Sequence, residues 1–272
     1  MTIPAADRTQ ATVRRRPARA RISRRRALIS ILLGLLLWEF IGRFVLTNAI
    51  LFAPFSKVIE VGWRMTVSGE IWRHLAVSAS EFFLGFGLAV LLGIAVGVLM
   101  GRSRLARDYI DPWVSILYSS PLVALMPFYL LLFGVGLLSK VAIIFTVSIF
   151  PILLNTYTGI RSADRNLLEV ARSFSCSPLQ TFTKIEIPSA LPFIITGIRL
   201  GLGRGLTGVV VGELFASRAG LGYVIATAGQ SFDAATVLLG VLLFTLSGLL
   251  MMGLLAWIEA ALAPWRTSLE QS

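Results

Sequence analysis

Long apolar blocks alternate with short polar segments along this chain. An α-helix needs about 20 consecutive apolar residues to cross a bilayer, and six of the blocks are close to that length. They cover residues 27–47, 78–100, 113–133, 138–158, 190–212 and 235–258. The pattern therefore predicts an all-α integral membrane protein with six transmembrane helices.

The composition agrees with a membrane protein. Hydrophobic residues make up 56% of the chain and charged residues only 14%, whereas an ordinary soluble domain has about 25% charged residues. The repeated apolar blocks favour a single polytopic bundle over one or two soluble domains. The single cysteine, Cys176, excludes an internal disulfide framework and any multi-cysteine metal site.

Positive charge is distributed unevenly, which predicts the topology. Nine arginines lie in residues 1–26, before the first apolar block, as in a cytoplasmic tail held against anionic lipid. An Arg-rich arm can also bind nucleic acid, but we expect no nucleic-acid partner. With this tail inside, the arginine-rich loops that follow the second and fourth blocks are inside too. Both termini are therefore predicted to be cytoplasmic. No cleavage site follows the first block, so we expect an uncleaved signal anchor.

On this basis the chain divides into four parts. Residues 1–26 form a disordered tail, 27–77 the first transmembrane helix and an outer loop, 78–262 the core domain, and 263–272 a second cytoplasmic tail. The core domain includes a long cytoplasmic loop, 160–189. In the outer loop, two tryptophans suggest short interfacial helices, but we prefer a plain connector.

The segment Glu169–Pro188 is a polar island between two apolar blocks. Asn166 and Glu169 fit a capping box, and Ser177 with Gln180 fits a second one. Because proline disfavours a helical residue before it, the second helix should end before Pro188. We expect two short helices joined by a tight turn, with the apolar side on the membrane domain and the polar side free. Such a loop predicts a docking surface for a soluble partner.

This segment resembles the EAA loop of the permease subunits of bacterial ABC importers. Four positions agree with that pattern, namely Glu169, Ala171, Ile185 and Pro188. Three positions depart from it: Ile187 replaces a leucine, Val170 replaces an alanine, and Ser175 replaces a glycine that would allow a left-handed turn. Since serine in that conformation costs about 1–2 kcal/mol, the turn is open to a different shape here.

Other segments resemble the nitrate, sulfonate and taurine branch of the same family. They include SSPLVALMP at 119–127, FPILLNTYTGIR at 150–161 and GIRLGLGRGLTGVVVGELF at 197–215. The resemblance implies a type I (MetI-like) permease of the bacterial inner membrane, working as a homodimer with two ABC ATPase subunits inside and a solute-binding protein outside. It also implies alternating access driven by ATP-Mg hydrolysis in the partner. The implied cargo is a small anion such as an aliphatic sulfonate, taurine or nitrate, with a pyrimidine or riboflavin-like solute as the alternative.

The sequence argues against enzymatic chemistry in this chain. None of its three lysines follows a Gly-rich phosphate-binding loop, and the single histidine, His74, stands in no catalytic or metal-binding motif. We therefore expect no ATPase activity, no cofactor and no metal of its own. A standalone secondary carrier and a membrane scaffold without a pathway remain as other classes.

Two groups of residues are candidates for function. The first is the coupling loop, which the resemblance assigns to Glu169, Ala171, Arg172, Ser175 and Pro188. Glu169 and Arg172 would meet the ATPase and Ala171 would let it approach closely. The alternative is that Glu169 only caps its helix and Arg172 only contacts lipid phosphate.

The second group lies within the spans, where a charge is costly and informative. Arg204, near the middle of the fifth span, could ease the passage of an anion, or could bond to carbonyls or to Glu39. The candidate pathway set is Arg204, Asn155, Ser119 and Ser120, although the last three could equally bond to neighbouring helices. Glu39 should pair with Arg43 one turn away, and Arg199 should reach the cytoplasmic surface. Stripes of glycine in the second and fifth spans indicate close helix packing.

Overall fold

A computed structural model describes residues 17–262, with side chains described for 25–259 except Ala216. Residues 1–16 and 263–272 lie outside the described part. Most of the predicted N-terminal tail and the whole predicted C-terminal tail are therefore not described. The described residues form helices and turns only. Five helices are long and apolar enough to cross a membrane, or six if one bent pair counts as a single span.

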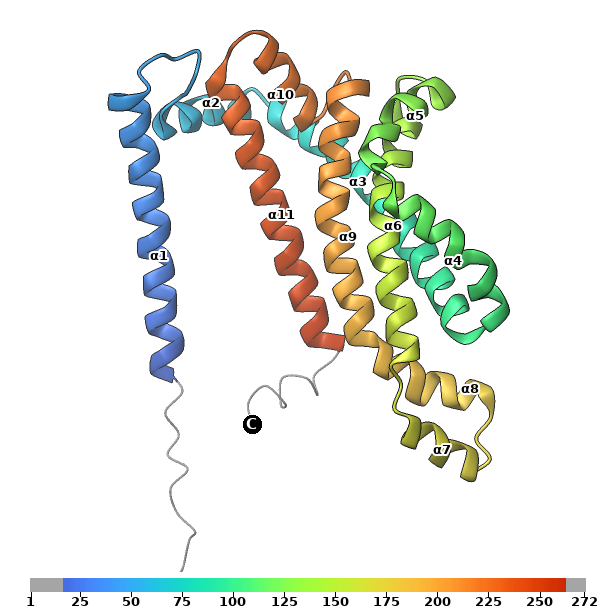
Figure 1. Cartoon of the computed structure of the whole chain (residues 1–272). Coiled ribbons are helices and arrows are strands. Elements are labelled where there is room, and N and C mark those ends of the chain that lie inside the picture. Colours follow the sequence, from blue (N-terminus) through green and yellow to red (C-terminus); the bar gives the residue numbers. More distant parts are fainter. Residues whose placement is uncertain (1–16, 263–272) are drawn as a thin grey trace, which may run out of the picture.

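The long helices agree with five of the predicted blocks, and most extend beyond them. They are α1 (Pro17–Phe40) with the π-helical turn η1 (Ile41–Val45), α3 (Glu70–Arg102), α6 (Leu137–Arg161), α9 (Ile187–Ala216) and α11 (Ala234–Leu262). Figure 1 shows the start of α1 and the end of α11 at the same end of the molecule. The same end carries the short helices α7 (Arg165–Ser173) and α8 (Pro178–Thr181).

The core is built on α6, which packs closely against both α3 and α9. The glycine stripes make this possible. A Cβ atom on Gly97 of α3 would lie 2.7 Å from the carbonyl oxygen of Leu153, and one on Gly208 of α9 would lie 3.0 Å from Cα of Ile144. The predicted packing role of the two stripes is confirmed, because both stripes bring backbones into contact with the same helix.

The third predicted span is not one continuous helix. The chain forms α4 (Arg104–Ser119), a 3₁₀ turn η2 (Leu122–Leu125) and α5 (Met126–Phe133), and the two parts are bent by 89°. Ser120 is extended (ψ 150°) directly before Pro121, as expected for a residue that precedes proline. The predicted span over 113–133 is thus divided in two, because this proline ends the first part.

The outer loop is also more structured than a plain connector, so our preference was wrong. It contains the 13-residue helix α2 (Phe55–Val67), and α10 (Leu221–Gln230) lies at the same end of the molecule (Figure 1). Val58 and Val61 of α2 are buried against Ala235 and Leu239 of α11. Of the two tryptophans, Trp63 is exposed on α2 and Trp72 is exposed in the first turn of α3.

Candidate functional site

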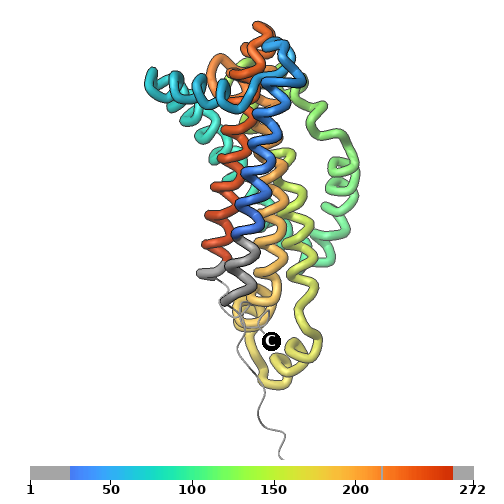
Figure 2. The backbone as a smooth tube through the Cα atoms, turned by 90° about the vertical axis from the view of Figure 1, so that its left-hand side faces the viewer, coloured from blue at the N-terminus to red at the C-terminus, as the bar shows by residue number. Residues whose placement is uncertain are grey.

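The helical hairpin formed by α7 and α8 projects beyond the ends of the long helices (Figure 2). α7 begins after Asp164, whose carboxylate accepts the N–H of Asn166 at 2.8 Å. The predicted capping box of Asn166 and Glu169 is therefore wrong, because the aspartate two residues earlier supplies the cap. The side chain of Glu169 is exposed and forms no hydrogen bond or ion pair with any other described side chain, and the same holds for Arg172.

The turn after α7 has the left-handed conformation that the family's glycine would give. Ser175 has φ +52°. The N–H of Cys176 donates to the carbonyl of Ala171 at 2.9 Å, and the N–H of Ser175 donates to that of Arg172 at 2.9 Å. These two bonds define a Schellman motif. Serine therefore occupies the glycine position without changing the shape of the turn.

The second capping box is confirmed, but the second helix does not stop before Pro188. Ser177 Oγ accepts the N–H of Gln180 at 3.2 Å, and Gln180 Oε1 accepts the N–H of Ser177 at 2.8 Å. α8 then continues through the π-helical turn η3 (Phe182–Glu186) directly into α9. Pro188, in the first turn of α9, is tolerated because a π-helical turn has already left the regular α-helical hydrogen-bond pattern.

The hairpin presents an apolar stripe to its surroundings, which differs from the expected apolar side on the membrane domain. Leu167, Val170 and Phe174 lie on one face of α7, and Phe174 is 78% exposed. Ala171, by contrast, is 5% exposed and faces the rest of the chain. Ala171 therefore cannot offer its methyl group to a partner in this conformation. The exposed stripe is the feature that the sequence analysis missed, although its i, i+3, i+7 spacing was readable.

A cavity of about 500 Å³ lies between α9, α6 and the broken segment of α4 and η2. Of the four predicted pathway residues, Arg204 and Ser120 line it, together with Tyr118, Pro151 and Thr207. Arg204 is exposed and forms no ion pair or hydrogen bond with any described residue. The alternative in which Arg204 bonds to Glu39 is wrong, since Glu39 is held elsewhere.

The other two predicted pathway residues are not brought to this cavity. Asn155 donates to the carbonyl of Pro151 at 2.8 Å, within its own helix. Ser119 Oγ donates to the carbonyl of Ser115 at 2.7 Å. Both satisfy their polar groups locally, as the alternative in the sequence analysis allowed.

The other charges that the sequence analysis named in the spans, Glu39, Arg43 and Arg199, form ion pairs. Glu39 and Arg43 form the expected ion pair, and Glu39 also accepts the N–H of Ser56 at 2.9 Å in the first turn of α2. The side chain of Arg199 is 48% exposed, and its guanidinium lies 2.5 Å from the carboxylate of Glu259 in α11. Among these arginines, Arg204 therefore stands out by facing a cavity instead of a carboxylate.

A buried polar network, which the sequence analysis did not predict, lies at the end opposite to the hairpin. Lys140 of α6 forms an ion pair with Glu81 of α3 and donates to Ser217 Oγ at 3.1 Å. Glu213 of α9 accepts hydrogen bonds from Ser78 Oγ and from the N–H of Gly222. Glu81 and Glu213 are 2% and 1% exposed. The sequence carried one signal for this network, namely opposite charges at the same end of different apolar blocks.

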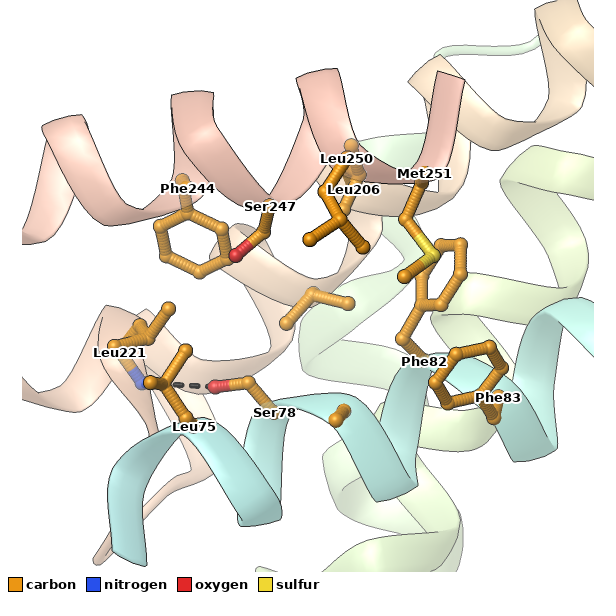
Figure 3. A pocket seen from close by; sticks show the side chains of 12 residues that line it. Leu75, Ser78, Phe82, Phe83, Leu206, Leu221, Phe244, Ser247, Leu250 and Met251 are labelled. Carbon is orange, nitrogen blue, oxygen red and sulfur yellow. Dashed lines mark hydrogen bonds between the residues drawn. The ribbon is translucent and has the colours of Figure 1, made fainter. Parts of the chain in front are cut away.

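The network borders a small apolar cavity of about 130 Å³ between α3, α9 and α11. In Figure 3, Ser78 points toward the backbone nitrogen of Leu221, and the other labelled side chains around it are almost entirely apolar. The cavity contains no charged lining residue. It therefore offers no group that could recognise a charged solute.

Comparison with known proteins identifies the family. Residues 89–264 match the family described as binding-protein-dependent transport system inner membrane component. SsuC of Bacillus subtilis, whose name assigns it to aliphatic sulfonates transport, is 34% identical over 95% of this chain and 94% of its own length. The taurine transport system permease protein TauC of Escherichia coli is 31% identical, with 85% and 86% covered.

A solved structure shows the same fold. The MetNI methionine ABC transporter in an inward-facing conformation contains a chain with a TM-score of 0.58 and 20% identity, which covers 72% of this chain and 95% of that one. The fold expectation of a MetI-like permease is thus confirmed. The chain belongs to the binding-protein-dependent family of ABC transporter permeases.

Proposed function

We propose that the chain is the membrane-spanning subunit of an ATP-driven importer and that α7 is the docking site of a separate ATPase subunit. The observation that carries this proposal is the exposed stripe of Leu167, Val170 and Phe174, flanked by the unpaired charges of Glu169 and Arg172. An exposed apolar patch rimmed by charge is typical of a protein–protein contact.

In this proposal the hairpin faces the cytoplasm of a bacterial cell and the bent pair α4–α5 completes the sixth span. The start of α1 and the end of α11 lie on the hairpin side (Figure 1), so both termini would be cytoplasmic. Arginines at the hairpin side of α3, α4 and α6, namely Arg102, Arg104, Arg107 and Arg161, are consistent with the positive-inside rule.

Alternating access would follow from the continuity of α8, η3 and α9. A displacement of the hairpin by the ATPase would pass directly along this helix to Arg204, which faces the cavity. The nucleotide and its magnesium ion would be bound by the partner, and this chain would supply the moving helices. A second copy of the chain would supply the other half of the pathway, and a solute-binding protein would deliver the cargo outside.

The cargo that fits best is a small anion such as an aliphatic sulfonate, taurine or nitrate. Arg204 offers a permanently charged, unpaired guanidinium to a cavity whose other polar groups are hydroxyls, namely Tyr118, Ser120 and Thr207. A guanidinium can bind a sulfonate or nitrate through parallel hydrogen bonds. The names of SsuC and TauC point to the same chemistry.

Purification of the tagged chain from its native membrane tests the docking proposal. We expect an ATPase to co-purify with the wild type and to be lost with Val170→Asp, which places a charge in the exposed stripe. Thr183→Asp adds the same charge at an exposed position outside α7 and should retain the ATPase. Ala171→Asp is a poorer probe because it would bury a charge. Retention of the ATPase by Val170→Asp would refute docking at α7, and uptake by the chain alone would identify a secondary carrier.

A further inference from the structure

Arg102, the last residue of α3, contacts the hairpin through its side chain. The Arg102 side chain lies with Nε 3.1 Å from Oε2 of Glu186 and with one terminal nitrogen 3.5 Å from the carbonyl oxygen of Pro178. Its guanidinium carbon lies 4.5 Å from the centre of the Phe182 ring. One arginine therefore contacts three residues of the continuous segment formed by α8 and η3.

The three partners share one face of that segment. Pro178, Phe182 and Glu186 are spaced four residues apart, so each successive partner lies about one helical turn further along. The planar guanidinium can stack on an aromatic ring while its edge faces a carboxylate. An isolated surface ion pair has little effect on stability, but three simultaneous contacts define one orientation. The Arg102 and Glu186 side chains are 38% and 18% exposed, so this contact is only partly in solvent.

The hairpin is linked to the long helices in two different ways. It is covalently continuous with α6 through residues 162–164 and with α9 through η3, whereas Arg102 provides a side-chain link to α3. At its other end α3 carries Ser78 and Glu81, which belong to the buried network with α6 and α9. A hairpin held to the end of α3 is thus connected along that helix to the opposite end of the molecule.

We propose that Arg102 is a positioning residue that makes α3 move together with the hairpin when the hairpin is displaced. The proposal rests on the proposed function, because the displacement comes from the docked ATPase. Without Arg102 the hairpin would still move α9, and α3 would be held there by the apolar contacts of Ile94 and Val98 with the cluster of Ile160, Ala190 and Ile194. The end of α3 would then follow the hairpin less closely.

Distance measurement between two spin labels tests this proposal without knowledge of the cargo. Cys176 in the hairpin is the single cysteine of the chain and is exposed, and Leu99→Cys places a second label on an exposed position of α3. Mixing with unlabelled chain keeps the measured pair within one copy. The distance is recorded without nucleotide and with the complex held by a non-hydrolysable ATP analogue.

In the chain with native Arg102 we expect one narrow distance that is the same in both states. Arg102→Leu should broaden the distribution and shift it on nucleotide binding, while the ATPase still co-purifies. Arg104→Leu is the matched control, since Arg104 is exposed and contacts no described side chain through a hydrogen bond or ion pair. Arg102→Lys keeps the charge but not the planar guanidinium, so it should narrow the distance only in part.

An unchanged, narrow distance in Arg102→Leu in both states would overturn the proposal. If Arg102→Leu does not fold, Glu186→Gln combined with Phe182→Leu removes the same contacts from the other side and should give the same broadening. If no ATPase co-purifies with the native sequence, the proposed function fails. The label distance in the permease alone then still decides whether Arg102 holds α3 to the hairpin.

Discussion

Ser78 of α3 donates its hydroxyl hydrogen to Oε1 of Glu213 in α9 at 2.6 Å, and the same hydroxyl accepts the N–H of Leu221 at 2.9 Å. One small side chain therefore joins two helices that are far apart in the sequence and also fixes the first turn of α10. All three residues are buried, so each contact replaces a contact with water. Removal of this one hydroxyl oxygen is therefore expected to lower the stability of the protein strongly.

Ser78→Ala should lower the free energy of unfolding by about 1–3 kcal/mol, because it leaves a buried carboxylate oxygen and a buried N–H without this partner. Ser80→Ala is the matched control on the same helix. Its hydroxyl is exposed and donates only to the carbonyl of Val77, so we expect little change. Thermal unfolding in detergent, followed by tryptophan fluorescence, compares the two variants, and equal midpoints would contradict the prediction.

Lys140→Met should be more damaging than Ser78→Ala. It leaves the buried carboxylate of Glu81 without its ion-pair partner, and removal of one member of a buried pair costs about 3–5 kcal/mol. The double variant Glu81→Leu, Lys140→Met removes both charges and should recover part of this loss. The free energies of unfolding of the wild type, Lys140→Met and the double variant, measured under one condition, show how much stability the second substitution recovers. A double variant less stable than Lys140→Met would refute the prediction.

The spans were predictable because apolar length is a local signal. Residues 137–161 and 187–216 read as spans since nearly every position there is apolar or small. The network of Glu81, Lys140 and Glu213 was not predictable in the same way, because each residue alone is only a charge near the end of a span. Which charges meet depends on how α3, α6 and α9 pack against one another. The pattern within any one segment does not contain that information.

The hairpin shows the same limit on a smaller scale. Ser177 and Gln180 lie three residues apart and form the capping box that their spacing predicts. For α7 the spacing favoured Asn166 as the cap, whereas Asp164, two residues earlier, supplies it. The buried position of Ala171 and the exposed position of Phe174 depend on how α7 docks against the rest of the chain, which no local pattern contains.

Gly97→Val should destabilise the contact of α3 with α6. A Cβ atom at Gly97 would lie 2.7 Å from the carbonyl oxygen of Leu153 and 2.7 Å from Cβ of Thr156, so the two backbones must separate. Overpacking of this kind costs about 1–3 kcal/mol or more. Gly87→Val, on the same helix with nothing within 4 Å, is the control. Similar unfolding midpoints for both valine variants would show that the contact tolerates separation.

Ser175→Gly should stabilise the hairpin. Ser175 has φ +52°, where a residue with a Cβ atom is disfavoured by about 1–2 kcal/mol. Part of this gain is offset because glycine makes the unfolded chain more flexible, so we expect a net gain of up to about 1 kcal/mol. Ser175→Val should have the opposite effect. Hydrogen exchange of the Cys176 amide, which closes the Schellman motif, reports the change locally, and faster exchange in the glycine variant would contradict the prediction.

Arg204→Gln should separate the choice of cargo from the coupling to the ATPase. The variant keeps hydrogen-bond donors at the cavity but removes the charge. Since a hydrogen bond to a charged group contributes about 1.5–3 kcal/mol, the half-saturating concentration for sulfonate uptake should rise about tenfold or more. The ATPase should still co-purify, because Arg204 lies in the second half of α9 (Ile187–Ala216), away from the end of the helix that adjoins the hairpin. Arg218→Gln, which removes an exposed charge outside the cavity, controls for net charge.

Uptake of taurine into proteoliposomes by the complete complex measures the effect. Unchanged taurine uptake by Arg204→Gln would refute the anion role of this residue. If the complex takes up a pyrimidine or riboflavin-like solute but no sulfonate, the cargo is the alternative one and Arg204 has another function.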